Sequence, residues 1–137
     1  MSENIIFHVD VNSAFLSWMA LKKLDEEPGS TDLRTIPSAV GGDESMRHGI
    51  VLAKSTPAKK YGIVTGEPLV KARQKCPALV TVRPDFEWFV KNSQALMKIL
   101  RKYAPSVEQY SIDEAFCDMS GTYGLYGDPV KFAYKLR

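Results

Sequence analysis

Three acidic side chains stand where they could act together on a metal ion. Asp10 lies near the end of the apolar run Ile5–Val11, and Asp113 and Glu114 are neighbours in the stretch Y-S-I-D-E-A-F-C-D. Carboxylate oxygens suit Mg²⁺ or Mn²⁺, whereas Zn²⁺ sites are built mainly from nitrogen and sulfur ligands. Two such ions about 4 Å apart could activate an attacking oxygen and hold a leaving phosphate. If the fold brings the three acids together, they predict metal-dependent chemistry on phosphates.

Each acid also has a structural explanation. Asp10 precedes a helix that Asn12 or Ser13 can cap, so it could cap that helix as well or point to solvent. Adjacent strand residues point to opposite faces, so one continuous strand would drive either Asp113 or Glu114 toward the core, where an unpaired charge is costly. A turn at S-I-D-E would instead put both acids at a hairpin tip, in a turn without Gly or Asn that is therefore expected to be strained. The remaining alternative is an exposed edge strand with solvated acids.

The segments that must position these acids alternate between strand and helix patterns. Strands are expected at residues 5–11, 36–40, 49–54, 78–82 and, in the hairpin interpretation, 107–112 and 115–119; helices are expected at 13–24, 58–61, 69–76, 86–104 and from 129 onward. A polar loop at residues 41–48 joins the second and third strands. The helix after the first strand would leave the backbone N–H groups of residues 12–15 available to phosphate oxygens. The alternation predicts an α/β fold, or an α+β sandwich.

Several other candidate residues are expected to be structural. His8 shares a strand face with Asp10, and we expect it to be packed or hydrogen-bonded rather than a metal ligand. Cys76 and Cys117 lack partners at metal-ligand spacing, so we expect two small core residues in a reduced protein. Apolar residues on one face of the long helix predict its buried side: Phe89, Leu96, Ile99, Leu100 and Tyr103.

Helix starts are marked by capping residues. Thr56-Pro57 can open one short helix, Asp85 the long helix, and Asp128-Pro129 the last helix. The last helix has no stop signal before Arg137, so we expect the natural protein to be longer.

Composition limits the possible classes of protein. The chain has 137 residues, 45% of them hydrophobic and 25% charged, which is typical of a globular domain. The N-terminus lacks a basic segment before its apolar run, and no run is long enough to span a membrane, so we expect a cytoplasmic protein without a membrane partner. A net charge of +2 indicates little about partners by itself.

The middle of the chain is more basic than its ends. Between Gly41 and Lys75, seven basic residues (Arg47, Lys54, Lys59, Lys60, Lys71, Arg73 and Lys75) outnumber three acids (Asp43, Glu44 and Glu67). This segment could supply positive charge for a triphosphate or a nucleic-acid backbone. The sequence thus separates a part that carries the acids from a basic insert.

Four blocks of sequence resemble the N-terminal part of Y-family translesion DNA polymerases of the DinB/UmuC type. In chain order they are H-V-D-V-N-S-A-F; A-V-G-G followed by G-I-V-L-A-K-S; P-A-K-K-Y-G-I-V-T-G-E-P; and Y-S-I-D-E-A-F-C-D. They cover nearly the whole chain, and S-I-D-E-A is the most specific. The resemblance implies a palm with a mixed or antiparallel sheet and helices on one face, formed by residues 1–30 and 83–137. It also implies a small fingers subdomain at residues 31–82, and more palm, a thumb and a little finger beyond the last residue.

The same resemblance implies a role for each acid. Asp10, Asp113 and Glu114 match the family's metal-binding, catalytic carboxylates, and the carbonyl of Val11 would complete the ligand set of two Mg²⁺ or Mn²⁺ ions. Phe15 matches the aromatic steric gate that excludes a ribose 2′-hydroxyl. Its alternative role is that of a core residue on an amphipathic helix.

The residues implied in nucleotide binding are Asn12, Ser13, Ala14, Phe15, Thr56 and Lys59. Thr56 and Lys59 stand where the family usually has Tyr and Arg, and Ser13 where an aromatic residue is common. Lysine keeps the positive charge of Arg but loses its bidentate fork. Thr56 could offer one hydroxyl or could cap its helix.

The activity that the resemblance implies is template-directed addition of dNTPs to a primer 3′-hydroxyl during DNA damage bypass. Primer–template DNA would be a partner, with a sliding clamp contacted through a later region, and we expect residues 1–137 alone to bind DNA poorly and to be inactive. One alternative is a non-catalytic nucleic-acid-binding or accessory module of the same fold, although three retained like charges argue against it. A metal-dependent phosphohydrolase is another, and it would need neither Phe15 nor a basic insert.

Overall fold

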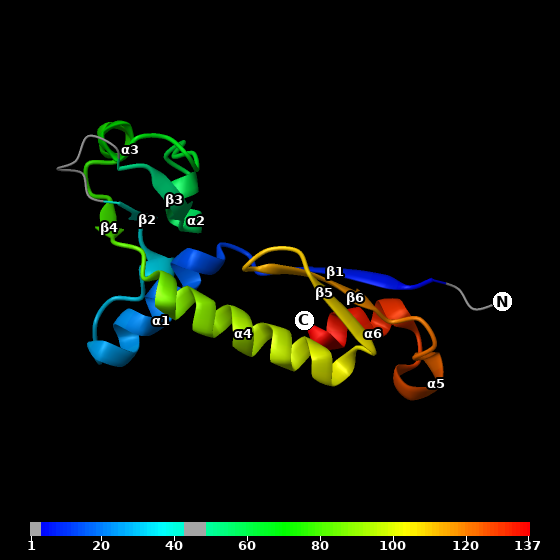
Figure 1. Cartoon of the computed structure of the whole chain (residues 1–137). Coiled ribbons are helices and arrows are strands. Elements are labelled where there is room, and N and C mark those ends of the chain that lie inside the picture. Colours follow the sequence, from blue (N-terminus) through cyan, green and yellow to red (C-terminus); the bar gives the residue numbers. More distant parts are fainter. Residues whose placement is uncertain (1–3, 43–48) are drawn as a thin grey trace. The chain divides into compact units, whose positions relative to one another are not determined.

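The computed structural model describes residues 4–42 and 49–137, so most of the predicted polar loop at 41–48 lies outside the described residues. The chain forms two compact units. The first unit contains residues 1–11 and 90–137, and the second unit contains residues 12–89. Strands and helices alternate along both, which confirms the predicted mixed α/β class (Figure 1). Among the described residues, no helix is both long and apolar enough to cross a membrane.

The first unit is built on a three-stranded antiparallel sheet. Its strands are β1 (Ile6–Asp10), β6 (Glu114–Asp118) and β5 (Ser106–Gln109), in the order β1-β6-β5. Because β6 is the middle strand, the alternative of an exposed edge strand for the paired acids is wrong. A turn at residues 110–113 joins β5 to β6, which confirms the hairpin. β5 is shorter than predicted, and Glu114 is the first residue of β6 rather than part of the turn, so only Asp113 lies in the turn itself.

Helices cover one face of this sheet. Residues 90–103 of α4 (Phe86–Tyr103) and α6 (Pro129–Leu136) lie on the same side of the strands, and the short helix α5 (Tyr123–Tyr126) precedes α6 (Figure 1). Ala115 and Cys117 of β6 are fully buried against this layer, and burial raises the pKa of the Cys117 thiol. The core of the first unit comprises Met97, Leu100, Ala104, Ala115, Cys117, Met119 and Phe132.

The opposite face of the sheet is open among the described residues. Strand alternation places Ile6, His8 and Asp10 of β1 on this face, together with Glu114, Phe116 and Asp118 of β6. The sheet therefore separates a buried apolar side from a side that carries the acids.

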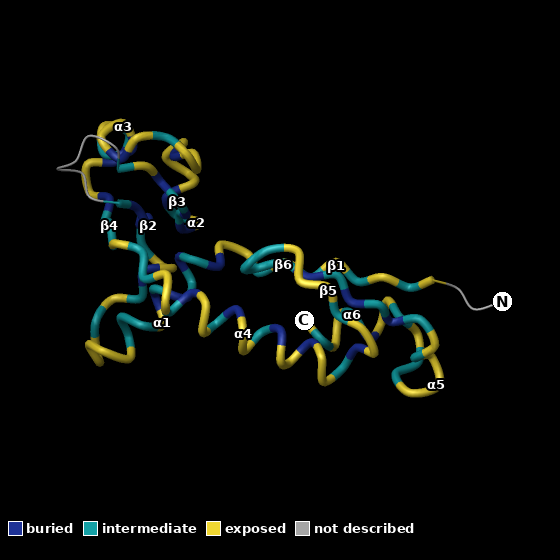
Figure 2. Tube along the Cα trace, viewed as in Figure 1, coloured by how far each residue is buried: buried dark blue, intermediate teal, exposed yellow. Residues whose placement is uncertain are grey.

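One prediction for the long helix was wrong. Figure 2 shows buried and exposed segments alternating along α4, and Phe89 and Leu100 are buried as expected. Ile99, however, is 52% exposed and lines a hollow beside β1, while Met97 takes a core position instead. Contact with the sheet decides which residues of α4 are buried. The spacing of apolar residues alone did not show which residues lie at the boundary of the buried face.

The second unit has its own sheet and helices. The strands β2 (Ser38–Gly41), β3 (Val51–Lys54) and β4 (Val80–Val82) have the order β3-β2-β4; β2 pairs antiparallel with β3 and parallel with β4. The helices are α1 (Ala14–Glu26), α2 (Thr56–Lys59), α3 (Leu69–Lys75) and the 3₁₀ turn η1 (Leu33–Thr35). A core of Ala39, Val51, Ala58, Ile63, Leu69, Ala72, Cys76 and Leu79 packs β2, β3, α2 and α3 together. Both cysteines are buried, as predicted.

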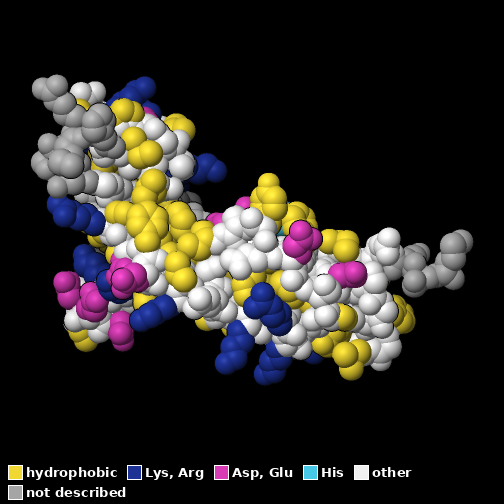
Figure 3. Space-filling view, viewed as in Figure 1, with side chains coloured by type: hydrophobic (Ala, Val, Ile, Leu, Met, Phe, Trp, Pro, Cys, Tyr) yellow, Lys and Arg dark blue, Asp and Glu magenta, His cyan; other side chains and the backbone are white. Residues whose placement is uncertain are grey.

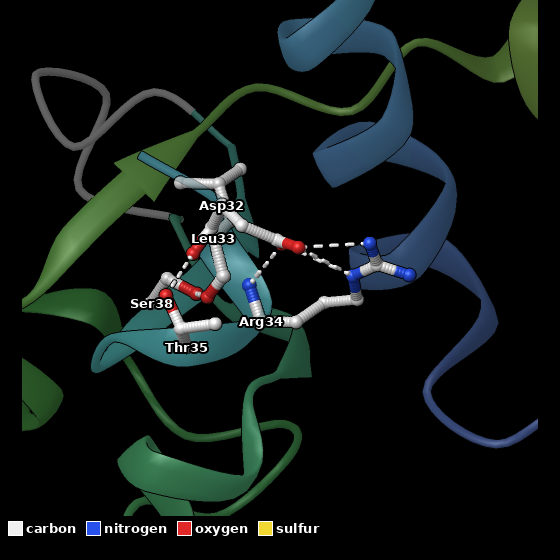
Figure 4. A network of polar contacts seen from close by, with 5 residues as sticks. All are labelled: Asp32, Leu33, Arg34, Thr35 and Ser38. Atoms are coloured by element: carbon white, nitrogen blue, oxygen red, sulfur yellow. Dashed lines mark hydrogen bonds and ion pairs between the residues drawn. The ribbon is translucent and has the colours of Figure 1, made fainter. Parts of the chain in front are cut away.

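Two short elements were not predicted, namely η1 and α5. Asp32 explains the first, because its carboxylate accepts from the backbone N–H of Arg34 at 3.0 Å and pairs with the Arg34 guanidinium (Figure 4). These contacts with Arg34 lower the pKa of Asp32. The buried Ser38 hydroxyl donates to the Leu33 carbonyl at 2.6 Å, which joins the turn to the start of β2. This network fixes the entry to the second sheet.

Candidate functional site

The three residues that carry the predicted carboxylates lie at one end of the first unit's sheet. Asp10 ends β1, Glu114 begins β6, and the two residues are direct cross-strand partners. Asp113 is the last residue of the turn before β6, and its carbonyl accepts from the Val11 N–H at 3.0 Å. The ladder between the two strands thus extends past Asp10 and brings Val11 beside the turn. Residues more than 100 positions apart in the sequence are therefore neighbours.

Backbone and side-chain hydrogen bonds, rather than unusual backbone angles, stabilise the turn that carries Asp113. The backbone N–H groups of Tyr110 and Ser111 both donate to the Glu114 carbonyl, at 3.0 and 3.2 Å. The Gln109 amide donates to the Ser111 carbonyl and to the hydroxyl of Ser93 on α4, both at 3.1 Å. No residue of this turn has a positive φ, so the predicted strain is wrong.

Ser111 contacts both of the adjacent acids. Its hydroxyl oxygen lies 3.0 Å from Asp113 Oδ1 and 3.0 Å from Glu114 Oε2. A single hydroxyl proton can be donated to only one carboxylate at a time, so the two acids share this donor. The sequence motifs did not single out Ser111, although its place in S-I-D-E, two residues before Asp113, was a signal that could have identified it.

His8 also contacts the site. Its Nε2 lies 3.1 Å from Glu114 Oε1, and its ring stacks on Phe116 with centroids 4.7 Å apart. The prediction of a hydrogen-bonded, packed histidine is confirmed. What the sequence did not reveal is that its partner is one of the three acids.

The residue types at this end of the sheet fit a hard divalent cation. Asp10, Asp113, Glu114 and the Val11 carbonyl offer oxygen ligands, and no Lys or Arg in the described part of the chain forms an ion pair with these acids. In residues 4–42 and 49–137, however, no three His, Cys, Asp or Glu side chains converge closely enough to form a ready-made metal cluster. The metal-binding role of the four residues thus stays a prediction.

The predicted nucleotide residues that follow β1 belong to the second unit. Asn12 and Ser13 are exposed and Ala14 is buried. Ser13 occupies the N-cap position of α1 with φ 48° and ψ 46°, and its side chain makes no capping bond, so the prediction that Asn12 or Ser13 caps this helix is wrong. Ser13 is the only non-glycine residue with a positive φ in the described chain. Such a conformation costs about 1–2 kcal/mol and is concentrated at functional sites.

Phe15 is half-buried on an aromatic cluster of the second unit. Its ring stacks on the fully buried Phe89 at 4.5 Å with an interplanar angle of 10°, and lies 6.3 Å from the ring of Trp18. One face of the ring is thus fixed by packing while part of the side chain stays exposed. This geometry is compatible with both roles considered for Phe15.

Thr56 and Lys59 are exposed at the two ends of α2. The cap of this helix is Ser55, whose hydroxyl accepts from the Ala58 N–H at 3.1 Å, so Thr56 is not the capping residue. Ser55 is also buried, and its hydroxyl donates to the Ile36 carbonyl at 2.7 Å. The structure therefore leaves the Thr56 side chain at the surface.

The basic insert divides into structural and surface cations. Arg73 donates to the Leu79 carbonyl and the Thr81 hydroxyl, and Lys75 pairs with Glu67 at 2.8 Å. Three further lysines are exposed, namely Lys59, Lys60 and Lys71. Figure 3 shows Lys and Arg side chains at the surface of the second unit around α3. Asp43, Glu44 and Arg47 lie outside the described residues.

The fold is shared with solved Y-family DNA polymerases. The crystal structure of DinB from Sulfolobus solfataricus matches with a TM-score of 0.76 and 27% sequence identity, over 96% of this chain and 36% of that chain. A Y-family DNA polymerase chimera, Dbh-Dpo4(243-245)-Dbh, gives a TM-score of 0.78 at 24% identity. The architecture of the chain is therefore that of a Y-family polymerase of the DinB type.

Sequence comparison assigns the family. Residues 9–137 match the impB/mucB/samB family model, and the chain belongs to this family. DNA polymerase IV of Clostridium acetobutylicum is 56% identical over 116 residues, which are 85% of this chain and 29% of that protein. DNA polymerase IV of Moorella thermoacetica is 41% identical over 137 residues, 99% of this chain and 32% of that protein. The chain thus spans about three tenths of the length of these relatives.

Proposed function

We propose that this chain is the catalytic N-terminal part of a translesion DNA polymerase that adds dNTPs to a primer 3′-hydroxyl on a DNA template. The observation that carries the proposal is the pairing of Asp10 with Glu114, with Asp113 beside them, at one end of an open sheet face. The family membership and the DNA polymerase IV relatives support the same activity. In this assignment residues 1–30 and 83–137 are palm, and residues 31–82 are fingers.

The three carboxylates and the Val11 carbonyl would hold two Mg²⁺ or Mn²⁺ ions. When bound, such ions lower the pKa of an attacking hydroxyl and neutralise phosphate charge in an in-line displacement. The chain's own contribution is to hold the oxygen ligands on two rigid strands and one hydrogen-bonded turn. Hydrogen bonds of Ser111 and Gln109 hold that turn, and the backbone positions of Asp113 and Glu114 are therefore well defined.

Residues of the second unit would contact the incoming nucleotide. Phe15, whose ring is fixed by stacking on Phe89, would act as the steric gate against a 2′-hydroxyl. Lys59 would neutralise phosphate as a point charge, and Thr56 would offer one hydroxyl. Asn12, Ser13 and Ala14 would contribute the backbone at the start of α1, where N–H groups are available to phosphate oxygens.

Primer–template DNA is the proposed partner, with a sliding clamp contacted through a later region and a cytoplasmic location. Two solved structures of similar fold, a ternary complex of Dbh with its substrates (25% identical) and a post-insertion binary complex of Dbh DNA polymerase (26% identical), support this choice of partner. We expect residues 1–137 alone to extend primers poorly, because the regions that complete the DNA grip in the longer relatives are not part of this chain.

The deciding experiment is primer extension by the full-length protein with Mg²⁺ and dNTPs, comparing wild type with Asp113→Asn. Loss of one oxygen ligand is expected to remove several kcal/mol of transition-state stabilisation, and hence at least about 100-fold in rate. Glu108→Gln is the matched control, because Glu108 lies on the same open face opposite Phe116 and has no role in the proposed site. Extension by Asp113→Asn at the wild-type rate would rule out the metal role.

A second candidate is a non-catalytic module of the same fold. It is favoured by the finding that, in the described residues, the three acids do not form a metal-binding cluster. The same assay separates the two. A non-catalytic protein would show no Mg²⁺-dependent extension in the wild type, and Asp113→Asn would then change nothing.

A further inference from the structure

We propose that His8 is a positioning residue that fixes the carboxylate of Glu114 for metal binding. This inference rests on the proposed function, in which Glu114 is a metal ligand. His8 lies on β1 two residues before Asp10, so both side chains share the open face of the sheet. Phe116 is its direct partner in register, and Glu114 is the diagonal neighbour. Diagonal neighbours on antiparallel strands are within reach of long side chains.

The hydrogen bond from His8 has a defined direction. An ionised carboxylate can only accept, so the ring N–H at Nε2 donates to Glu114 Oε1 across 3.1 Å. The other carboxylate oxygen, Oε2, lies 3.0 Å from the hydroxyl of Ser111. Each oxygen has more than one acceptor position, so both contacts leave lone pairs for a cation. Glu114 is thus held by two donors from different segments of the chain.

The imidazole ring is itself held in place. It stacks on Phe116 with an interplanar angle of 18°, and Tyr110 packs edge-on against Phe116, with ring centroids 5.8 Å apart. A stacked ring has little freedom to rotate its N–H away from Glu114. The stack on Phe116, which Tyr110 also contacts, therefore restricts the direction of the His8 donor.

The contact is too exposed to be explained by fold stability. The side chains of His8 and Glu114 are 50% and 29% exposed, and ion pairs at such positions contribute little to folding. A glutamate side chain has several rotatable bonds, however, and fixing them costs conformational entropy. If the side chain is already ordered, metal binding does not have to supply this free energy. Hydrogen-bond partners of metal ligands typically change metal affinity by about 10- to 100-fold when they are removed. The expected consequence of losing His8 is thus weaker metal binding in a protein that still folds.

The test measures Mn²⁺ affinity of the full-length protein by electron paramagnetic resonance of the free ion, with circular dichroism as the check of folding. His8→Phe keeps the stack on Phe116 and removes the donor. His8→Gln places an amide nitrogen the same number of bonds from Cβ and keeps the donor. We expect His8→Phe to weaken Mn²⁺ binding about tenfold and His8→Gln to stay within about threefold of wild type. Glu108→Gln, on the same face, is expected to match wild type.

Two further variants separate this inference from the proposed function. Glu114→Gln and Asp113→Asn should both weaken Mn²⁺ binding strongly; if neither does, the metal assignment itself is wrong. If both do and the two His8 variants bind equally, whether like wild type or weakly, the positioning role is wrong. In primer extension, His8→Phe should raise the metal concentration for half-maximal activity while the rate at saturating metal recovers. A rate that stays low at saturating metal would overturn the proposal.

Discussion

Asp10 and Glu114 face each other directly across β1 and β6, and no Lys or Arg in the described chain forms an ion pair with either residue. Like charges at directly opposed strand positions destabilise a sheet. In the metal-free protein this pair therefore works against folding, whereas a bound cation would remove the repulsion. Function and stability should respond in opposite directions when one of the charges is removed.

Asp10→Asn is expected to stabilise the metal-free fold while abolishing activity. The free energy of unfolding should rise by about 0.5 kcal/mol, which is within the range of about 0.2–1 kcal/mol for cross-strand side-chain pairs. Urea denaturation in the presence of a chelator measures this change. Glu108→Gln is the control, since Glu108 faces Phe116 rather than another acid and should show no such gain.

Adding Mg²⁺ should make wild type more stable than Asp10→Asn, the opposite of the order expected without metal. A ligand at 100 times its dissociation constant stabilises the folded state by about 2.7 kcal/mol, and this gain should appear in wild type but not in Asp10→Asn. Potassium chloride at matched ionic strength separates binding from screening. Equal responses of the two proteins to Mg²⁺ would show that Asp10 is not a ligand.

Phe15→Ala should change both sugar selectivity and stability. Removal of the ring opens space beside the nucleotide in the proposed site, so ribonucleotide incorporation relative to dNTP incorporation should rise. Loss of the stack on Phe89 should lower the free energy of unfolding by about 2 kcal/mol, less than the loss for a fully buried Phe.

Phe86→Ala provides the matched control, because Phe86 also packs on Phe89, edge-on at 5.6 Å, but lies on a different helix and is not part of the proposed site. It should lower stability without changing sugar selectivity. If both variants relax selectivity equally, Phe15 acts only as a core residue.

The sequence predicted those features that local chemistry determines. Asp85 accepts from the Trp88 N–H at 3.1 Å and Asp128 from the Val130 N–H at 3.3 Å, so both helix caps were correct. The hairpin beside Asp113 followed from the cost of burying a charge in a continuous strand. Cap and turn preferences act over a few residues, which is why they are visible in the sequence.

Features set by packing and by distant contacts were not predictable in this way. The exposure of Ile99 depends on where the sheet meets α4, and apolar periodicity does not contain that information. The left-handed conformation of Ser13 breaks the rule that a serine before a helix caps it with its side chain. The contact of His8 with Glu114 joins residues 106 positions apart and required the register of β1 on β6.

Gly41→Ala should destabilise the second unit by steric conflict. Gly41 lies at an irregularity in the pairing of β2 with β3, where a Cβ would sit 2.7 Å from the Ile50 carbonyl oxygen and 2.8 Å from a Leu69 methyl carbon. Overpacking of this kind costs about 1–3 kcal/mol. Gly124→Ala is the control, because a Cβ there would meet no atom within 4 Å. Urea denaturation of both variants checks the difference; equal stability would mean that β2 and β3 can separate without cost.

Glu67 should make the second unit sensitive to acid. Its side chain is only 8% exposed, and the pKa of Glu67 is lowered first by its hydrogen bond from Lys75 and second by the Val64 N–H, at 2.8 Å each. A carboxylate whose pKa is lower in the folded state stabilises the fold above its unfolded pKa, and this stabilisation is lost as the pH falls through the folded pKa. Glu67→Gln should therefore reduce the free energy of unfolding by about 1 kcal/mol at pH 7.

The difference in the free energy of unfolding between wild type and Glu67→Gln should shrink as the pH falls below the usual glutamate pKa of about 4.5. Urea denaturation at several pH values from 7 down to about 3 measures this convergence. Lys75→Gln and the double variant complete a thermodynamic cycle, which isolates the pair from the separate contact of Glu67 with Val64. The coupling energy should be present at pH 7 and absent at the lowest pH, because a protonated Glu67 no longer attracts the ammonium of Lys75. A coupling energy that does not change with pH would show that the pair acts through packing rather than charge.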